Sequence, residues 1–173
     1  STVFPAVKAM GEDKAEKIFY LTAKTIAGTV AHEAFRTLRK CGLHFKTIAE
    51  AVPEVPVLLY NNPGRVGYTM SANLVDKLAH EVENIVGMKD TSGDITQTAE
   101  FIRRTRDVNF KVFGGKDTLL YASMCHGAVG GVCTAANFMP ELITDVYNKF
   151  VEGDLQGSLE AQFKLNPVRL SMD

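Results

Sequence analysis

The residue of this sequence with the clearest capacity for covalent chemistry is Lys89. It follows a short apolar run at 85–88, which is typical of a buried strand, and it precedes a polar, glycine-containing segment at 90–94. A lysine held among aliphatic side chains is desolvated, which lowers the pKa of an ammonium and leaves part of it as a free amine able to attack a carbonyl. The alternative is a lysine whose stem lies over the strand end while its ammonium reaches water.

The composition excludes several kinds of protein. The chain has 173 residues, of which 46% are hydrophobic and 23% charged, with a formal net charge of −1. This is typical of a soluble globular chain and gives no reason to expect a nucleic acid or a membrane surface as partner. No stretch has the length of a membrane-spanning helix, and the first residues lack the pattern of a signal peptide. The basic run at 103–106 is followed by Asp107, so we interpret it as a solvated helix end and not as a phosphate-binding patch.

The cysteines and histidines indicate neither disulfides nor a metal. The three cysteines are odd in number and have no metal or redox spacing, so we expect reduced thiols in the cytoplasm: Cys41, Cys125 and Cys133. The four histidines form no ligand pattern, and we therefore expect no metal site.

From about residue 55 onward the pattern alternates between strands and helices. Continuous apolar runs predict strands at 55–60, 85–88, 110–113 and 128–133. Helices are predicted from about 71, from 94, through 119–124, from Pro140 to Gly153, and from Asp154 onward. This repetition, at intervals of roughly 20 to 30 residues, indicates a parallel sheet with crossover helices.

Two architectures fit that repetition, an open doubly wound sheet and a (β/α)8 barrel. No predicted strand is followed by a glycine-rich phosphate loop, which weakens the nucleotide-binding version. In both architectures ligands bind beyond the carboxyl ends of the strands. The polar and small residues of interest gather at those ends: Tyr60, Asn61, Lys89, Gly114, Gly115 and Thr134.

The first part of the chain is less regular. Apolar spacing predicts helices at 14–27, 32–40 and 43–51, with no room between the last two for a strand. A (β/α)8 barrel needs about 250 residues. Either the fold is a different one, or segments of a parent protein are missing from the first half and after the last residue. We favour missing segments.

Two motifs carry a family resemblance: YNNPGRVG at 60–67 and GMKD at 87–90. With GGKD at 114–117 and GGVCT at 130–134, they resemble the dihydrodipicolinate synthase / N-acetylneuraminate lyase family, and the likeness runs from about residue 45 to 173. Members are pyruvate-dependent class I aldolases on a (β/α)8 barrel. The resemblance therefore implies a single, incomplete (β/α)8 TIM-barrel domain over residues 1–173.

The resemblance implies that Lys89 forms a Schiff base with pyruvate and that Tyr60 relays protons. Imine formation must protonate a departing hydroxyl, and the aldol step must move a proton to and from the acceptor oxygen. Neighbouring strands lie about 4.8 Å apart, so these two side chains can converge. The alternative for Tyr60 is a core residue whose hydroxyl bonds to backbone.

Other positions match binding residues of the family. Arg65 corresponds to an arginine that holds the carboxylate of aspartate semialdehyde in the synthases, the alternative being an exposed loop arginine. Gly115 and Val132 correspond to positions lining the pyruvate pocket, for which barrel packing is an equally good explanation. The family's loop that holds the pyruvate carboxylate is represented at most by Ser1 and Thr2. Asp117 corresponds to a position that contacts sugar hydroxyls in the lyases.

Three functional hypotheses follow. The first is a pyruvate-lysine aldolase that condenses pyruvate with aspartate semialdehyde in lysine biosynthesis, with no cofactor beyond the covalent imine. The second is a retro-aldol lyase of a 2-keto-3-deoxy sugar acid or of N-acetylneuraminate. The third is a non-catalytic ligand-binding domain in which Lys89 pairs with a carboxylate such as Asp90. The resemblance also implies a homo-oligomer, either a dimer or a tetramer.

Overall fold

Five parallel strands form one sheet. The computed structural model describes residues 19–21 and 43–171, and the strand order is β1-β2-β3-β4-β5. The strands are β1 (Phe19–Leu21), β2 (Val57–Asn61), β3 (Ile85–Asp90), β4 (Lys111–Gly114) and β5 (Gly130–Gly131). Because each strand pairs in parallel with the next one along the chain, all carboxyl ends meet at one edge.

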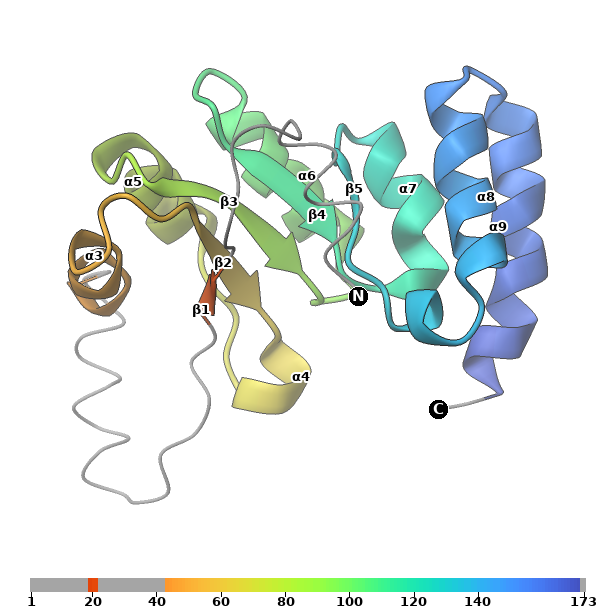
Figure 1. Ribbon diagram of the computed structural model, residues 1–173, viewed down its shortest axis with the longest axis horizontal. Coiled ribbons are helices and arrows are strands. Elements are labelled where there is room, and N and C mark those ends of the chain that lie inside the picture. Colours follow the sequence, from red (N-terminus) through yellow and green to blue (C-terminus); the bar gives the residue numbers. More distant parts are fainter. Residues whose placement is uncertain (1–18, 22–42, 172–173) are drawn as a thin grey trace.

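Helices connect these strands and follow the last of them. They are α3 (Leu43–Glu50), the single turn α4 (Pro63–Val66), α5 (Ala72–Glu81), α6 (Ile95–Thr105), α7 (Leu120–Cys125), α8 (Pro140–Val151) and α9 (Leu155–Leu170). Two short 3-10 turns, η1 (Asp117–Leu119) and η2 (Thr134–Asn137), follow β4 and β5. Figure 1 shows α4 at the arrowhead of β2 and the antiparallel pair α8 and α9 at the far end of the molecule.

The predicted strand and helix repetition from residue 55 onward is confirmed, with shifts at the ends. The second strand begins two residues later than predicted and extends through Asn61, and the third strand continues past Lys89 to Asp90. The fifth strand shrinks to two glycines. The chain after β2 enters α4, where Pro63 occupies the first turn and its missing N–H costs nothing.

The predicted helix at 14–27 is wrong at residues 19–21. These residues form β1, whose backbone pairs Phe19 with Val57 and Leu21 with Leu59. Aromatic residues suit strands as well as helices, and pairing with β2 outweighs the apolar spacing. The first part of the chain therefore does contribute a strand. The rest of that prediction and the helix predicted at 32–40 lie outside the described residues, whereas the helix predicted at 43–51 is confirmed as α3.

Helix starts are set by polar caps, as the sequence indicates. The Asp94 carboxylate accepts hydrogen bonds from the backbone N–H groups of Thr96 and Gln97. Asp154 caps α9 through the N–H of Gly157 at 2.8 Å. These side chains satisfy donors that the first turn of a helix leaves without partners.

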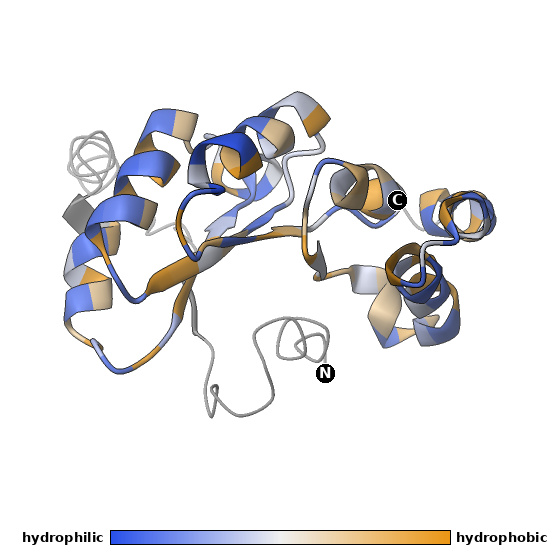
Figure 2. Ribbon diagram, turned by 90° about the horizontal axis from the view of Figure 1, so that it is seen from above, coloured by the Kyte–Doolittle hydropathy of each residue, from blue (hydrophilic) through white to orange (hydrophobic). Residues whose placement is uncertain are grey.

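The two faces of the sheet have different roles. On one face, Val57, Leu59, Met88 and Val112 pack with residues of α3, α5 and α6 in a large apolar cluster. A smaller cluster on the other face contains Leu58, Phe113 and Val132. Figure 2, seen from above, shows the helices gathered along one side of a curved sheet. The helix-covered face therefore packs the main core, and the face with the smaller cluster carries the candidate site residues.

Candidate active site

Lys89 and Tyr60 lie opposite each other on neighbouring strands. The register of β2 and β3 pairs them directly, and residues paired in this way point to the same face of the sheet. Lys89 Nζ donates a hydrogen bond to the Tyr60 hydroxyl oxygen at 3.3 Å and lies 4.4 Å from the centre of the Tyr60 ring. Both residues are half-buried. The amine and the phenol thus converge as the sequence predicts.

The next pair in register, Asn61 and Asp90, occupies the opposite face. Both are buried, at 1% and 3% exposed, and Asn61 Nδ2 donates to Asp90 Oδ1 at 2.9 Å. Asn61 Oδ1 also accepts the backbone N–H of Met70 at 3.0 Å. Because side chains alternate between faces along a strand, this pair keeps Tyr60 and Lys89 together on the other face.

The Asp90 carboxylate is satisfied without a cation. It accepts hydrogen bonds from the N–H and the hydroxyl of Ser92 at 3.1 and 2.9 Å and from the Thr98 hydroxyl at 2.6 Å, besides the one from Asn61. No ion pair joins Lys89 to Asp90 in the described part of the chain. The contact that the non-catalytic hypothesis gave as its example is therefore absent.

Gly115 lies against the stem of the lysine. An ideal Cβ at this position would stand 2.8 Å from both Lys89 Cε and the carbonyl oxygen of Asp90. The Gly115 N–H donates to that same carbonyl at 2.7 Å. Glycine is therefore needed here because the loop after β4 passes too close to β3 for any side chain.

Val132 belongs to the apolar cluster on the face of the sheet that carries Lys89 and Tyr60. It is 6% exposed and packs with Leu58 and Phe113, and Phe113 is the register partner of Lys89 on β4. Its N–H donates to the carbonyl of Gly114 at 2.8 Å. This position suits a pocket wall and suits core packing equally, as in the sequence interpretation.

The structure describes Arg65 but not Thr2. Arg65 lies in α4, directly after β2, and is exposed. Its guanidinium makes no hydrogen bond or ion pair with any described residue, so it is available to an anion. Thr2 lies outside the described residues.

Asn62 is a site residue that the sequence interpretation missed. Its side-chain Nδ2 donates to the Tyr60 hydroxyl at 3.0 Å, so this oxygen has two donors, Asn62 and Lys89. The available signal was an asparagine immediately before the proline of α4. An asparagine in this position normally predicts a helix cap, and the sequence pattern gives no sign that its side chain bonds to Tyr60 instead.

Asp117 has a structural partner for each of its oxygens. Its carboxylate accepts the N–H groups of Thr134 and Ala135 at 2.9 and 3.0 Å, and it forms an ion pair with Arg169 Nε at 2.9 Å. Asp117 is only 3% exposed. These contacts join the loop after β4 to the start of η2 and to α9. They leave little capacity for the sugar hydroxyls that this position contacts in lyases of the family.

The described cysteines and acidic residues supply no second reactive centre. Burial raises the pKa of the Cys133 thiol far above its ordinary value, with the nearby Asp117 carboxylate adding to the shift, so this thiol stays protonated. Cys125 and Cys133 are both free.

Among residues 19–21 and 43–171, no group of three histidines, cysteines or carboxylates could hold a metal ion. No described helix is long and apolar enough to span a membrane.

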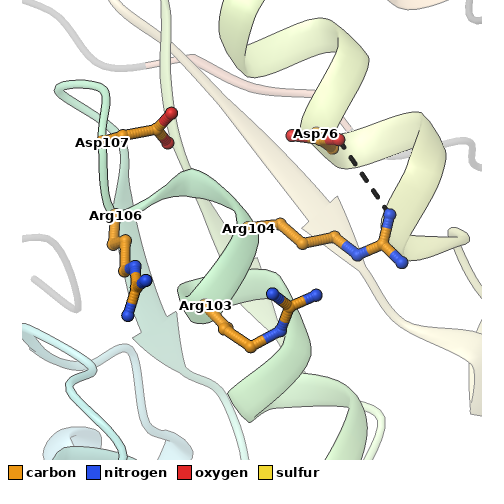
Figure 3. Close-up of a pocket in the computed structure, with 5 residues that line it drawn as sticks. All are labelled: Asp76, Arg103, Arg104, Arg106 and Asp107. Atoms are coloured by element: carbon orange, nitrogen blue, oxygen red, sulfur yellow. Dashed lines mark ion pairs between the residues drawn. The ribbon is translucent and has the colours of Figure 1, made fainter.

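A surface hollow between α5 and α6 contains the basic run at 103–106. Figure 3 shows Arg104 extending from α6 toward Asp76 on α5. Arg103 and Arg104 also bond to Glu100 at 2.8 and 2.6 Å, and these contacts lower the pKa of Glu100 to about 2. The run lies at the exposed end of α6, as predicted, with its first two arginines already paired.

Comparison with known proteins agrees with this geometry. Residues 35–172 match the family model for the dihydrodipicolinate synthetase family. The chain is 33% identical over 171 residues to the 4-hydroxy-tetrahydrodipicolinate synthase of Methanococcoides burtonii, covering 95% of this chain and 58% of that protein. It is 40% identical over 125 residues to the corresponding synthase of Microcystis aeruginosa, covering 72% and 41%.

Solved structures show the same relationship. Dihydrodipicolinate synthase of Aquifex aeolicus superimposes with a TM-score of 0.71 at 32% identity over 76% of this chain and 44% of that one. The chloride-inhibited dihydrodipicolinate synthase of Acinetobacter baumannii in complex with pyruvate gives 0.68 at 34% identity over 73% and 43%. The chain thus spans about half the length of the relatives it matches. Its parallel sheet and helices form part of a (β/α)8 barrel, as predicted.

Proposed function

Because the chain belongs to the dihydrodipicolinate synthetase family, we propose that it acts as a pyruvate-dependent aldolase through a Schiff base on Lys89. The observation that carries the proposal is the 3.3 Å hydrogen bond between Lys89 Nζ and the Tyr60 hydroxyl. An amine beside a phenol, at the carboxyl ends of parallel strands, is the arrangement that imine chemistry on a small keto acid needs.

The first half of the reaction builds the imine. The Lys89 amine attacks the keto carbon of pyruvate: a carbon–nitrogen bond forms, the carbonyl π bond opens onto oxygen, and a proton moves from the nitrogen to that oxygen. Tyr60 gives its proton to the hydroxyl of the resulting carbinolamine, which leaves as water, and the nitrogen supplies the electron pair for the imine. The imine on Lys89 replaces any separate cofactor or metal in this proposal.

The second half joins the acceptor. Loss of a proton from the pyruvate methyl group gives an enamine, whose carbon attacks the aldehyde. The new alkoxide takes a proton through Tyr60, and the imine is then released from Lys89 by water or by the amine of the product. We propose aspartate semialdehyde as the acceptor, which makes the product 4-hydroxy-tetrahydrodipicolinate.

Arg65 supports this choice of acceptor. It is an exposed guanidinium on the turn that follows Tyr60, with no bond to another described residue. A planar, bidentate donor suits the acceptor's carboxylate. The alternative, cleavage of a sugar acid or of N-acetylneuraminate, gains nothing from Asp117, because that carboxylate already accepts two backbone N–H groups and pairs with Arg169.

The remaining family positions take supporting roles in the proposal. Gly115 leaves space for the lysine stem. Val132 bounds the pocket on its apolar side. Thr2 belongs to the loop that holds the pyruvate carboxylate in the family. We place the enzyme in the cytoplasm as a homo-oligomer, a dimer or a tetramer, whose states sedimentation analysis would separate.

Trapping with borohydride tests the chemistry directly. The full-length protein carrying this sequence is incubated with pyruvate and sodium borohydride, then digested and analysed by peptide mass spectrometry. We expect a reduced pyruvate adduct on Lys89 and no adduct in Lys89→Ala. A folded protein that carries no adduct on Lys89 would exclude the Schiff-base mechanism.

A second measurement tests the acceptor. In Arg65→Ala, imine trapping with pyruvate should be unchanged, while kcat/KM for aspartate semialdehyde falls by about a hundredfold because a charge-assisted bidentate contact is lost. Arg106→Ala, which removes an exposed arginine from the C-terminal end of α6, serves as the control. Turnover of aspartate semialdehyde that survives the Arg65 change intact would reject this acceptor assignment.

A further inference from the structure

Asn62 occupies a helix-capping position but does not cap its helix. It is the residue before the first turn of α4, and its carbonyl accepts the N–H groups of Arg65 and Val66 at 3.0 and 3.1 Å. An asparagine at such a position normally turns its side-chain oxygen onto the N–H of the second or third helical residue, here Gly64 or Arg65. In α4 no such side-chain bond forms, and Nδ2 reaches the Tyr60 hydroxyl at 3.0 Å instead. A local rule is broken at the point where the chemistry takes place, which is typical of a functional residue.

The second donor determines where the phenolic proton points. A tyrosine hydroxyl carries one proton and accepts hydrogen bonds on its lone pairs. Asn62 Nδ2 and Lys89 Nζ both donate to the Tyr60 oxygen, at 3.0 and 3.3 Å. While both nitrogens donate to this oxygen, the hydroxyl proton of Tyr60 points away from both of them.

The two donors differ in what happens to them during the reaction. Lys89 changes from amine to imine and ceases to be a constant partner. Asn62 has no reactive group, and its backbone is fixed by the turn of α4. Asn62 is therefore the donor that holds the phenolic oxygen in place while Tyr60 loses and regains its proton. A fixed dipole aimed at a developing negative charge is most effective in a partly dry site.

We propose that Asn62 is a positioning residue of the proton relay, which orients the Tyr60 hydroxyl through the hydrogen bond from its side-chain amide. This inference rests on the proposed function, because it assigns Asn62 a task only if Tyr60 relays protons to and from the imine on Lys89.

Two substitutions separate the hydrogen bond from the shape of the side chain. Asn62→Leu removes the donor and keeps approximate volume. Asn62→Asp keeps the shape but presents a carboxylate, which accepts only, until it is protonated and regains a donor. The matched control is Asn73→Leu, an exposed asparagine of α5 that bonds to Arg104. Because the Asn62 side chain makes no cap, the unfolding temperatures of its variants should match the wild type.

Rapid-quench borohydride trapping with pyruvate measures the rate of imine formation, and steady-state assays separate kcat from KM. In Asn62→Leu we expect imine formation and kcat to fall about tenfold, with KM for pyruvate changed less than about twofold, because general acid–base steps lose orientation and substrate binding does not. For Asn62→Asp, the ratio of the wild-type rate of imine formation to the variant's rate should shrink as the pH falls from about 8 to about 5.5. For Asn62→Leu this ratio should stay constant. Asn73→Leu should match the wild type.

The outcomes distinguish this inference from the proposed function. Wild-type protein that forms no adduct on Lys89 rejects the proposed function, and the inference with it. Wild-type protein that is trapped on Lys89, with folded Asn62→Leu trapped at the same rate, rejects the inference alone. A wild-type rate of imine formation in Asn62→Asp at every pH, with Asn62→Leu slow, would show that Asn62 acts through shape and not through its donor, which also overturns the inference.

Discussion

Asn61 and Asp90 share a 2.9 Å hydrogen bond one residue beyond Tyr60 and Lys89, on the opposite face of the same two strands. The two pairs are neighbours in register, so whatever fixes the first pair also fixes the second. A one-residue slip of β3 against β2 would bury Lys89 in the helix-covered core and bring Asp90 onto the face that carries Tyr60. The buried amide–carboxylate bond is thus a structural reason for the placement of the amine.

Replacing Asp90 should test that coupling. Asp90→Ala removes the buried acceptor that Asn61 and Thr98 bond at 2.9 and 2.6 Å and leaves each donor only longer bonds. We expect a loss of about 3 kcal/mol in the free energy of unfolding. Urea denaturation measures it. Glu160→Ala, on the exposed side of α9, should change the unfolding free energy little. A change at Asp90 no larger than the one at Glu160 would contradict the structural role of this bond.

Gly115 should be intolerant of the smallest side chain. A Cβ there would stand 2.8 Å from Lys89 Cε, whereas a Cβ on Gly64 would meet no atom within 4 Å. We expect Gly115→Ala to slow imine trapping on Lys89 about a hundredfold, because the new Cβ also meets Thr91 Oγ1 and the Asp90 carbonyl, so the loop and the lysine stem must both shift. Gly64→Ala should react at close to the wild-type rate. Equal trapping rates for these two alanine variants would show that the stem can move at no cost.

Much of the sheet and the convergence of Lys89 with Tyr60 could be predicted from the sequence. The runs that form β2, β3 and β4 are continuously apolar, and the helices between them repeat with the helical period, so strand and helix are easily told apart. Parallel pairing then brings all strand ends to one edge. Their position at that edge, together with the motifs around them, predicted that Lys89 and Tyr60 would meet.

The parts that could not be predicted depend on contacts distant in sequence or on the direction of a side chain. Residues 19–21 form a strand only because they pair with β2, 36 or more residues later. Asn62 bonds to Tyr60 and not to its own helix, a choice that no spacing rule encodes. The resemblance likewise matched Asp117 to a position that contacts sugar hydroxyls in the lyases. In the structure its partners are η2 and Arg169 of α9, 52 residues away.

The Asp117 contacts give a prediction of their own. Asp117→Asn removes the charge that pairs with Arg169 and turns one buried acceptor into a donor. We expect the free energy of unfolding to fall by about 3 kcal/mol in urea denaturation. KM for pyruvate should rise as well, because Gly115 lies two residues earlier on the same loop. Asp145→Asn, which breaks an exposed pair with Lys149 on α8, should change neither quantity much. Wild-type stability in Asp117→Asn would mean that this buried pair contributes nothing.

His80 joins α5 to the loop before β4 and should make stability depend on pH. Its Nδ1 bonds to the backbone carbonyl of Asp76 at 2.8 Å, and its Nε2 lies 3.3 Å from Asp107 Oδ2. These two contacts, the first being the larger, raise the pKa of His80 above 6.5, and the bond from His80 lowers the pKa of Asp107.

The sign of the effect follows from linkage. Because the pKa of His80 is higher in the folded protein, its contribution is fully present below pH 6.5 and is lost as the pH rises through the folded value. The difference in unfolding free energy between wild type and His80→Gln should therefore be larger at about pH 5.5 than at about pH 8. His126→Gln is the matched control, since His126 is exposed and bonds to no carboxylate among the described residues. If urea denaturation shows that the unfolding free energies of both variants depend on pH in the same way, then the contact of His80 with Asp107 does not stabilise the protonated imidazole.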